Sequence, residues 1–173
     1  MWTICAVVAA VVLAAGASTR FGSPKQRILL DPVLERVHAA ASVEDVLVVL
    51  GAHEVETDTR TVRCPDWERG TGASLRCGLE ALPPDAEAAV VVLADGPDLS
   101  PAAVDRVVAR WREGAGEIVV ASYGGERGHP VVIGRGAWAS VPDGGARELG
   151  AVLVACDDLG APGDVDVPDD LNR

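Results

Sequence analysis

Two basic side chains follow the first apolar run of the sequence, in a stretch of small residues. Arg20 and Lys25, the one lysine of the chain, come after Leu-Ala-Ala-Gly-Ala-Ser at positions 13–18. Small residues let backbone amides approach an anion, a guanidinium binds phosphate oxygens through two N–H groups, and an ammonium adds a mobile positive charge. The pattern therefore predicts a phosphate-binding loop, and its alternative is an ordinary loop with solvated basic residues. The loop does not contain the P-loop motif G-x-x-x-x-G-K-[ST]. Its Gly16 and Gly22 do not fit the dinucleotide-binding motif G-x-G-x-x-G either.

A carboxylate follows another strongly apolar run. Asp95 comes directly after Val-Val-Leu-Ala at positions 91–94. An Asp at the end of a buried strand points into the ligand crevice of an α/β sheet, where it can hold a divalent cation. The alternative is that Asp95 or Asp98 hydrogen-bonds the backbone of the turn that follows. The carboxylates at 164–170 are, by themselves, typical of a solvated acidic segment.

Six apolar, β-rich runs predict the strands that must position these side chains. Helical patterns separate several of the runs, which predicts an α/β domain with a mainly parallel sheet. Ligands bind such sheets outside the carboxyl ends of the strands, so the loops after those ends are where chemistry is expected. The runs cover residues 4–14, 45–50, 88–94, 117–121, 130–133 and 151–155.

Three helices are predicted from caps and apolar spacing. Asp31-Pro32 combines a capping carboxylate with proline at the first helical position, which predicts a helix to about Ala41. Apolar spacing predicts a second helix over 72–82. Ser100-Pro101 begins a third in the same way, and it is expected to end near Arg112.

The first apolar run also resembles the hydrophobic part of a signal peptide, with Ala-Gly-Ala at 15–17 as a possible cleavage site. No Lys or Arg precedes the run, and it is too short to span a bilayer. A buried parallel strand has the same Val-rich composition, and we favour it because a functional loop follows. No other stretch is long and apolar enough for a membrane, so we expect a cytoplasmic protein.

Composition excludes several classes of protein. The 173 residues predict one domain, 1–173, and the net charge of −11 argues against a nucleic-acid surface. To bind a phosphorylated ligand against this net charge, the protein needs cations at the site or backbone N–H groups that point at the phosphate. The four cysteines form no C-x-x-C pair, so free thiols are expected rather than a zinc site.

The loop at 13–25 resembles the signature L-A-A-G-x-S-x-R-M-G-x-x-K of the MobA-like and MocA-like nucleotidyltransferases, related to molybdenum-cofactor guanylyltransferase and cytidylyltransferase. Phe21 stands where the family has Met. The resemblance implies a three-layer α/β/α fold with a mainly parallel, Rossmann-like sheet of the nucleotide-diphospho-sugar transferase type. It also implies that this loop holds a nucleoside triphosphate, with Arg20 and Lys25 on the phosphates. The loop residues implied in nucleotide binding are Leu13, Ala14, Ala15, Gly16, Ala17 and Ser18.

Two further motifs imply a Mg²⁺ site. Leu-Ala-Asp-Gly-Pro-Asp-Leu at 93–99 resembles L-A-D-Q-P-x-L, in which Asp95 is the metal ligand and Gly96 replaces Gln. The segment 164–171 resembles the ending D-I-D-T-P-E-D-L, which implies Asp166 as the second metal ligand and Asp164 as its less favoured substitute. One or two carboxylates plus phosphates are the usual ligands of Mg²⁺.

The remaining motifs imply contacts to the two substrates. Residues 67–79 resemble W-x-x-G-x-x-x-S-L-R-x-G-L, which places Gly72 and Ser74 against the base and ribose. Gly-His-Pro-Val at 128–131 and Asp-Gly-Gly-Ala-Arg at 143–147 resemble acceptor loops, with His129 and Arg147 as acceptor-binding residues. The chain lacks three features that are usual in the family: an Asn a few residues before Trp67, a G-x-P turn after Lys25 and part of the segment 51–64. The resemblance therefore implies a shortened member of the family.

The expected activity is a Mg²⁺-dependent nucleotidyl transfer from CTP to a phosphorylated, molybdopterin-like acceptor, with a molybdoenzyme as possible partner. Ala15 favours CTP because the guanylyl branch usually has L-A-G-G. The alternatives are a GTP-using enzyme, a sugar- or polyol-phosphate nucleotidyltransferase, a non-catalytic molybdenum-cofactor chaperone and a secreted domain. Neither nucleic acid nor a membrane is expected as a partner.

Overall fold

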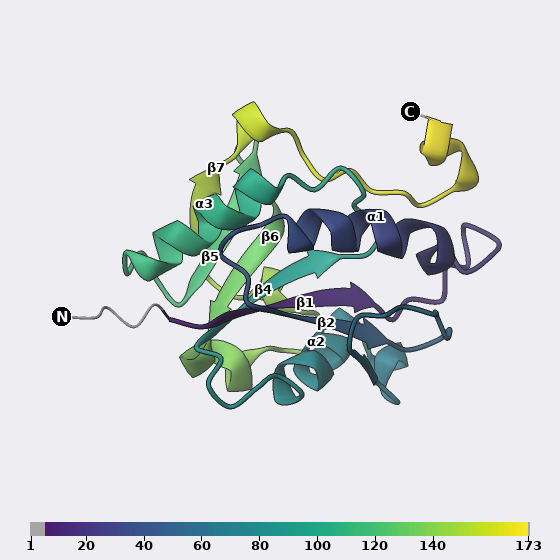
Figure 1. Cartoon of the computed structure of the whole chain (residues 1–173), viewed down its shortest axis with the longest axis horizontal. Helices are drawn as coiled ribbons and strands as arrows, with labels where there is room; N and C mark the ends of the chain where they lie inside the picture. Colours follow the sequence, from purple (N-terminus) through teal and green to yellow (C-terminus); the bar gives the residue numbers. More distant parts are fainter. Residues whose placement is uncertain (1–5, 173) are drawn as a thin grey trace.

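Seven strands form one twisted sheet in the centre of the molecule (Figure 1). The structure is a computed structural model that describes residues 6–172. The strand order is β3-β2-β1-β4-β6-β5-β7, and β6 is antiparallel to β4 and β5 whereas the other neighbours are parallel. The strands are β1 (Val8–Ala14), β2 (Asp45–Leu50), β3 (Thr61–Arg63), β4 (Ala88–Leu93), β5 (Ile118–Tyr123), β6 (Glu126–Gly134) and β7 (Val152–Ala155).

Helices cover both faces of the sheet. α1 (Gln26–His38) and α3 (Pro101–Arg112) pack on one face, and α2 (Thr71–Glu80) packs on the other (Figure 1). Alternate residues of β1 separate the two cores: Val12 belongs to the core under α1 and α3, and Val11 to the core over α2. This is the expected three-layer α/β/α architecture. Short 3₁₀ helices add Trp67–Arg69, Arg135–Ser140, Ala146–Glu148, Asp157–Leu159 and Pro168–Asn172.

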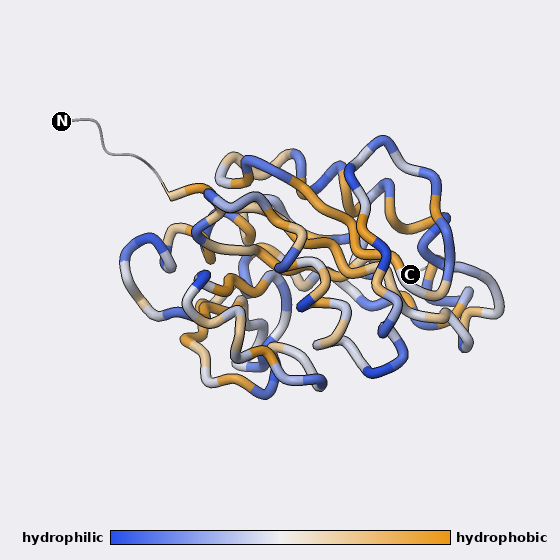
Figure 2. Tube along the Cα trace, turned by 90° about the horizontal axis from the view of Figure 1, so that it is seen from below, coloured by the Kyte–Doolittle hydropathy of each residue, from blue (hydrophilic) through white to orange (hydrophobic). Residues whose placement is uncertain are grey.

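The apolar runs of the sequence lie along the strands, as the central orange segments of Figure 2 show. Val8–Ala14 is buried throughout and pairs with strands on both sides, which confirms the strand interpretation for these residues. Residues 4 and 5 of the predicted run lie outside the described part of the chain. β3 was not predicted, because its three residues are half-exposed at the sheet edge and carry no apolar run.

The predicted start of the first helix is wrong. The helix begins at Gln26 with Lys25 at the N-cap position, so Asp31 and Pro32 both lie inside it. Buried residues recur at helical spacing on both sides of the proline, at Gln26, Leu29, Leu30, Val33, Leu34 and Val37. Proline removes the hydrogen bond to the carbonyl of Ile28, but Ile28 and Pro32 both lie on the exposed face, where water can bind that carbonyl. Burial of the apolar face therefore outweighs the local proline signal.

The other helices and the thiols follow their predictions more closely. α3 begins at Pro101 after Ser100 and ends at Arg112, and α2 begins one residue before its predicted start. Cys64, Cys77 and Cys156 are free thiols, whereas Cys5 lies outside the described residues. Among the helices of residues 6–172, none combines the length and the apolar character that crossing a membrane requires.

Candidate active site

Three segments far apart in the sequence meet at the carboxyl ends of β1 and β4. These strands are neighbours, with Leu13 paired to Leu93, so the loop after β1 and the turn after β4 lie side by side. The C-terminal segment then returns across the same edge, and the N–H of Val165 donates to the carbonyl of Asp95 at 3.0 Å. The sheet topology thus brings together residues 15–25, Asp95 and the acidic segment 164–170.

The ammonium of Lys25 lies between carboxylates from two of these segments. Its Nζ is 2.9 Å from Asp95 Oδ2, 2.7 Å from the carbonyl of Val165 and 3.4 Å from Asp166 Oδ1. The Lys25 side chain is 13% exposed, so little water screens these charges. Arg20 Nη1 lies 3.0 Å from the other oxygen of Asp166 while most of its guanidinium faces solvent. The side chains of Lys25, Arg20, Asp95 and Asp166 therefore form one network of ion pairs.

The two carboxylates of this network and a third beside them could hold a divalent cation. Asp95, Asp164 and Asp166 each offer an oxygen within 4.8 Å of the others. Asp95 Oδ1 is buried and has no hydrogen-bond partner within residues 6–172. A buried carboxylate oxygen without a donor is costly unless a cation or water binds it. Hard oxygen ligands of this kind suit Mg²⁺ or Mn²⁺.

Asp164 has an environment that disfavours its charge. Partial burial raises its pKa first, and repulsion from Asp95 and Asp166 raises it further, whereas Lys25 and Arg20 lower it. The sequence motif ranked Asp164 below Asp166, but the structure groups both with Asp95. A cation at this point would relieve the repulsion among the three carboxylates.

A polar cavity of about 370 Å³ lies over the network. Its lining includes Leu13, Ala14, Gly16 and Ser18 of the predicted loop, together with Arg20, Lys25, Asp95 and Asp166. Ser18 has φ of 55°, and its carbonyl accepts from the N–H groups of Phe21 and Gly22, so the loop turns sharply before Lys25. Thr71 and Gln26 also line the cavity, and no motif singled them out.

The two predicted contacts from α2 are placed differently. The N–H of Gly72 donates to the carbonyl of Asp143 at 2.9 Å, and a Cβ on Gly72 would lie 1.7 Å from the carbonyl oxygen of Pro142. Ser74 is 3% exposed and does not line the polar cavity. Gly72 thus packs α2 against the loop 142–145, whereas Thr71 of the same helix lines the polar cavity.

A second cavity, of about 820 Å³, adjoins the first and shares Leu13 and Thr71 with it. Both predicted acceptor residues, His129 and Arg147, line it. Burial lowers the pKa of His129 to about 4, although the negative charge of Asp95 acts to raise it. The imidazole is therefore neutral near pH 7. The hydroxyl of Tyr123 donates to the carbonyl of His129 at 2.8 Å.

The loop that carries Arg147 is held by other side chains. Arg127 donates to the carbonyls of Ala146, Arg147 and Leu149 at 2.8–3.2 Å. Arg69 and Arg76 both pair with Asp143, and the hydrogen bond from Arg76 is the main cause that lowers the pKa of this carboxyl. The Arg147 side chain, by contrast, has no ion pair among residues 6–172 and lies exposed at the cavity.

Comparisons with known proteins agree with the signature loop. The sequence model of a family described as the MobA-like NTP transferase domain matches residues 10–157. The bifunctional protein GlmU of Rubrobacter xylanophilus is 34% identical over 125 residues, which are 64% of this chain and 26% of that protein. The chain spans only 21–26% of the length of the curated relatives it matches.

Solved structures match nearly the whole chain. Rv0371c from Mycobacterium tuberculosis H37Rv is 29% identical with a TM-score of 0.82, and the match covers 99% of this chain and 98% of that one. A complex of Rv0371c with manganese matches with a TM-score of 0.74 and 29% identity, covering 96% and 97% of the two chains. A nucleotidyl transferase from Methanothermobacter thermautotroptrophicus shares the fold, with 21% identity, a TM-score of 0.72 and coverage of 96% and 95%.

Proposed function

Since this chain belongs to the MobA-like NTP transferase family and is a nucleotidyltransferase, we propose that it moves a nucleoside monophosphate from CTP to a phosphorylated, molybdopterin-like acceptor. Mg²⁺ is the proposed cofactor and pyrophosphate the second product. An oxygen of the acceptor phosphate attacks the α-phosphorus in line, and the bond from that phosphorus to the bridging β-oxygen breaks. The attacking phosphate is already ionised near pH 7, so the step needs no strong general base.

The residues divide into phosphate-binding and metal-binding groups. The amides of 16–18 and Arg20 hold the β- and γ-phosphates, and Lys25 neutralises charge on the transferred and leaving oxygens. Asp95 and Asp166, with Asp164 beside them, hold the metal. Mg²⁺ bound there would neutralise phosphate charge, which is the main part of catalysis in such transfers. The manganese complex of Rv0371c supports a divalent metal in this proposal.

One observation carries the proposal: the ammonium of Lys25 and the carboxylates of Asp95 and Asp166 face a single cavity over the carboxyl ends of β1 and β4. A triphosphate needs both kinds of group, cations for its oxygens and carboxylates for its metal. The adjoining cavity supports a separate acceptor, because Arg147, which has no ion pair within residues 6–172, can meet a phosphate there. Ala15 is the basis for preferring CTP over GTP.

Release of pyrophosphate measures the reaction directly. Each of the four nucleoside triphosphates is combined with MgCl₂ and with molybdopterin, a sugar phosphate or a polyol phosphate. We expect release with CTP and molybdopterin. Pyrophosphate release with GTP, or with a sugar phosphate, would show that the proposed nucleotide or acceptor is wrong. Tight molybdopterin binding without pyrophosphate release in any combination would indicate a carrier.

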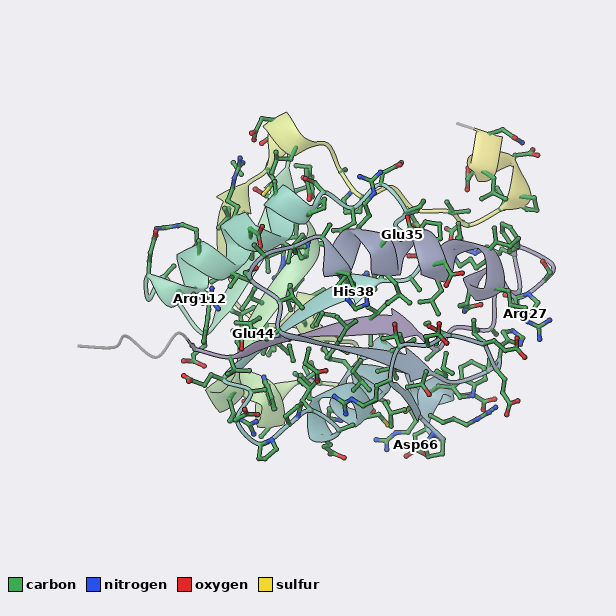
Figure 3. All side chains as sticks on the ribbon, viewed as in Figure 1. Arg27, Glu35, His38, Glu44, Asp66 and Arg112 are labelled. Atoms are coloured by element: carbon green, nitrogen blue, oxygen red, sulfur yellow. The ribbon has the colours of Figure 1, made fainter. Side chains whose placement is uncertain are left out.

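Variants test the proposed residues in the same assay. Lys25→Ala and Asp95→Ala are each expected to abolish release while circular dichroism shows a retained fold. Arg27→Ala and Asp31→Ala remove exposed charges from α1 and are the matched controls (Arg27 is labelled in Figure 3). Turnover like that of the wild type in either site variant would falsify the assignment.

A further inference from the structure

Three consecutive carbonyls of the loop after β1 accept hydrogen bonds from residues outside the loop. The carbonyl of Ala15 accepts from the N–H of Ala52 at 3.1 Å. The carbonyl of Gly16 accepts from Gln26 Nε2 at 2.7 Å, and that of Ala17 lies 2.8 Å from His53 Nε2. A carbonyl oxygen only accepts, so His53 carries a proton on Nε2 in this contact.

These contacts fix where the loop amides point. In a planar trans peptide group the C=O and the following N–H point in opposite directions. The N–H groups of Gly16, Ala17 and Ser18 therefore point away from Ala52, Gln26 and His53. None of the three donates to any acceptor within residues 6–172. Gly16 and Ser18 of this segment line the polar cavity, where N–H groups that have no acceptor in the protein can bind an anion.

A chain of hydrogen bonds sets the orientation of the Gln26 amide. The N–H of Lys25 donates to Ser18 Oγ at 3.3 Å, so the hydroxyl of Ser18 donates onward to Gln26 Oε1 at 2.8 Å. The amide nitrogen of Gln26 is left to donate to Gly16. Gln26 is 4% exposed, so water cannot replace these hydrogen-bond partners without a cost in free energy.

We propose that His53 and Gln26 are positioning residues that hold three backbone N–H groups ready for the β- and γ-phosphates of the nucleotide, and hence for pyrophosphate. This inference rests on the proposed function and adds to it two residues outside the signature loop. Their role is to fix the amides before the ligand arrives, so that ordering the loop costs no binding free energy.

His53 offers the sharper test because it lies half-buried in the loop after β2, where a substitution spares the core. His53→Phe keeps a ring but loses the donor, whereas His53→Gln keeps an N–H group that can reach the carbonyl of Ala17. Calorimetry with inorganic pyrophosphate and MgCl₂ measures the affinity. We expect about five- to tenfold weaker binding in His53→Phe, the value of one positioned hydrogen bond. His53→Gln is expected to stay within about twofold of the wild type.

His38→Phe is the matched control, because His38 is exposed at the other end of α1 (labelled in Figure 3). Gln26→Leu loses both hydrogen bonds of that side chain and is expected to weaken pyrophosphate binding more than His53→Phe. The melting temperature of each variant without ligand is measured alongside. An unchanged melting temperature in His53→Phe, with rescue by His53→Gln, supports positioning.

The outcomes separate this inference from the proposed function. If the wild type binds no pyrophosphate, the proposed function fails first and the inference fails with it. If the wild type binds but His53→Phe binds within twofold of it, the inference alone is overturned. It is also overturned if His53→Phe melts several degrees lower and His53→Gln restores neither stability nor affinity.

Discussion

Lys25 balances three carboxylates that the fold brings to one point. The chain carries 26 acidic and 15 basic residues, and Asp95, Asp164 and Asp166 would repel one another without a nearby cation. The ammonium of Lys25 bonds Asp95 and Asp166 and a backbone carbonyl between them. An arginine could not fill this position in the same way, because its planar guanidinium needs a wider and more open partner geometry.

His129 predicts how stability depends on pH. Its pKa is about 4 in the folded chain, mainly because of burial, against 6.5 when unfolded. The unfolded state therefore takes up a proton as pH falls below 6.5 while the folded state does not, and stability is lost down to about pH 4. We expect a loss of about 2–3 kcal/mol between pH 7 and 4.5 from this residue. Urea unfolding at the two pH values measures it.

The comparison variant for that measurement is His129→Gln, which cannot titrate. It is expected to lose about 2–3 kcal/mol less than the wild type over the same pH interval. His38→Gln replaces an exposed histidine on α1 and is measured alongside as the matched control. Equal losses in the wild type and in His129→Gln would show that His129 is protonated as easily in the folded chain as in the unfolded one.

Sequence patterns identify the charged residues of the site better than its polar supports. Arg20, Lys25 and Asp95 stand out because their types and positions after apolar runs are unusual. Gln26 and His53 carry no such signal, since their contacts depend on how three carbonyls are oriented in space. Gly72 was expected to lie against the base and ribose of a nucleotide, but the close approach of 142–143 to α2 lets its N–H donate to the carbonyl of Asp143. Only the packing of two distant segments determines this.

At the scale of elements, burial decides where local signals conflict. Apolar runs predict six strands to within a few residues, and the hairpin between β5 and β6 turns at Gly124 and Gly125, both with positive φ. The edge strand β3 has no run to reveal it. Asp31-Pro32 looks like a helix start, yet α1 continues through it because six residues of its inner face are buried.

Pro32→Ala tests that boundary. A proline inside a helix costs about 3 kcal/mol relative to alanine, while its restriction of the unfolded chain returns up to about 1 kcal/mol. We expect Pro32→Ala to stabilise the protein by about 1–2 kcal/mol in urea unfolding. Pro101, at the start of α3, is the matched control, and Pro101→Ala should be neutral or slightly destabilising. A Pro32→Ala variant no more stable than Pro101→Ala would place the helix start at Asp31 after all.

At the scale of the whole molecule, a net charge of −11 must coexist with a ligand that carries several negative charges. Arg20 and Lys25 line the polar cavity together with Asp95 and Asp166, and each cation is paired with at least one of these carboxylates. A triphosphate that binds Arg20 and Lys25 draws these cations away from Asp95 and Asp166, and a divalent metal compensates the carboxylates in their place. The triphosphate and the metal are therefore each expected to favour the binding of the other.

Thermal unfolding measures this coupling on the intact protein. A ligand present at a hundredfold its dissociation constant stabilises the folded state by about 2.7 kcal/mol, which raises the melting temperature of a domain this size by about 5–10 °C. We expect CTP with MgCl₂ to give such a rise, and CTP with EDTA or MgCl₂ without nucleotide to give much less than half of it. In Asp95→Asn the rise with both should fall toward that with CTP and EDTA, because the metal loses a ligand. If CTP raises the melting temperature equally with MgCl₂ and with EDTA, the nucleotide binds without a metal on these carboxylates. The proposed coupling between metal and nucleotide would then be wrong.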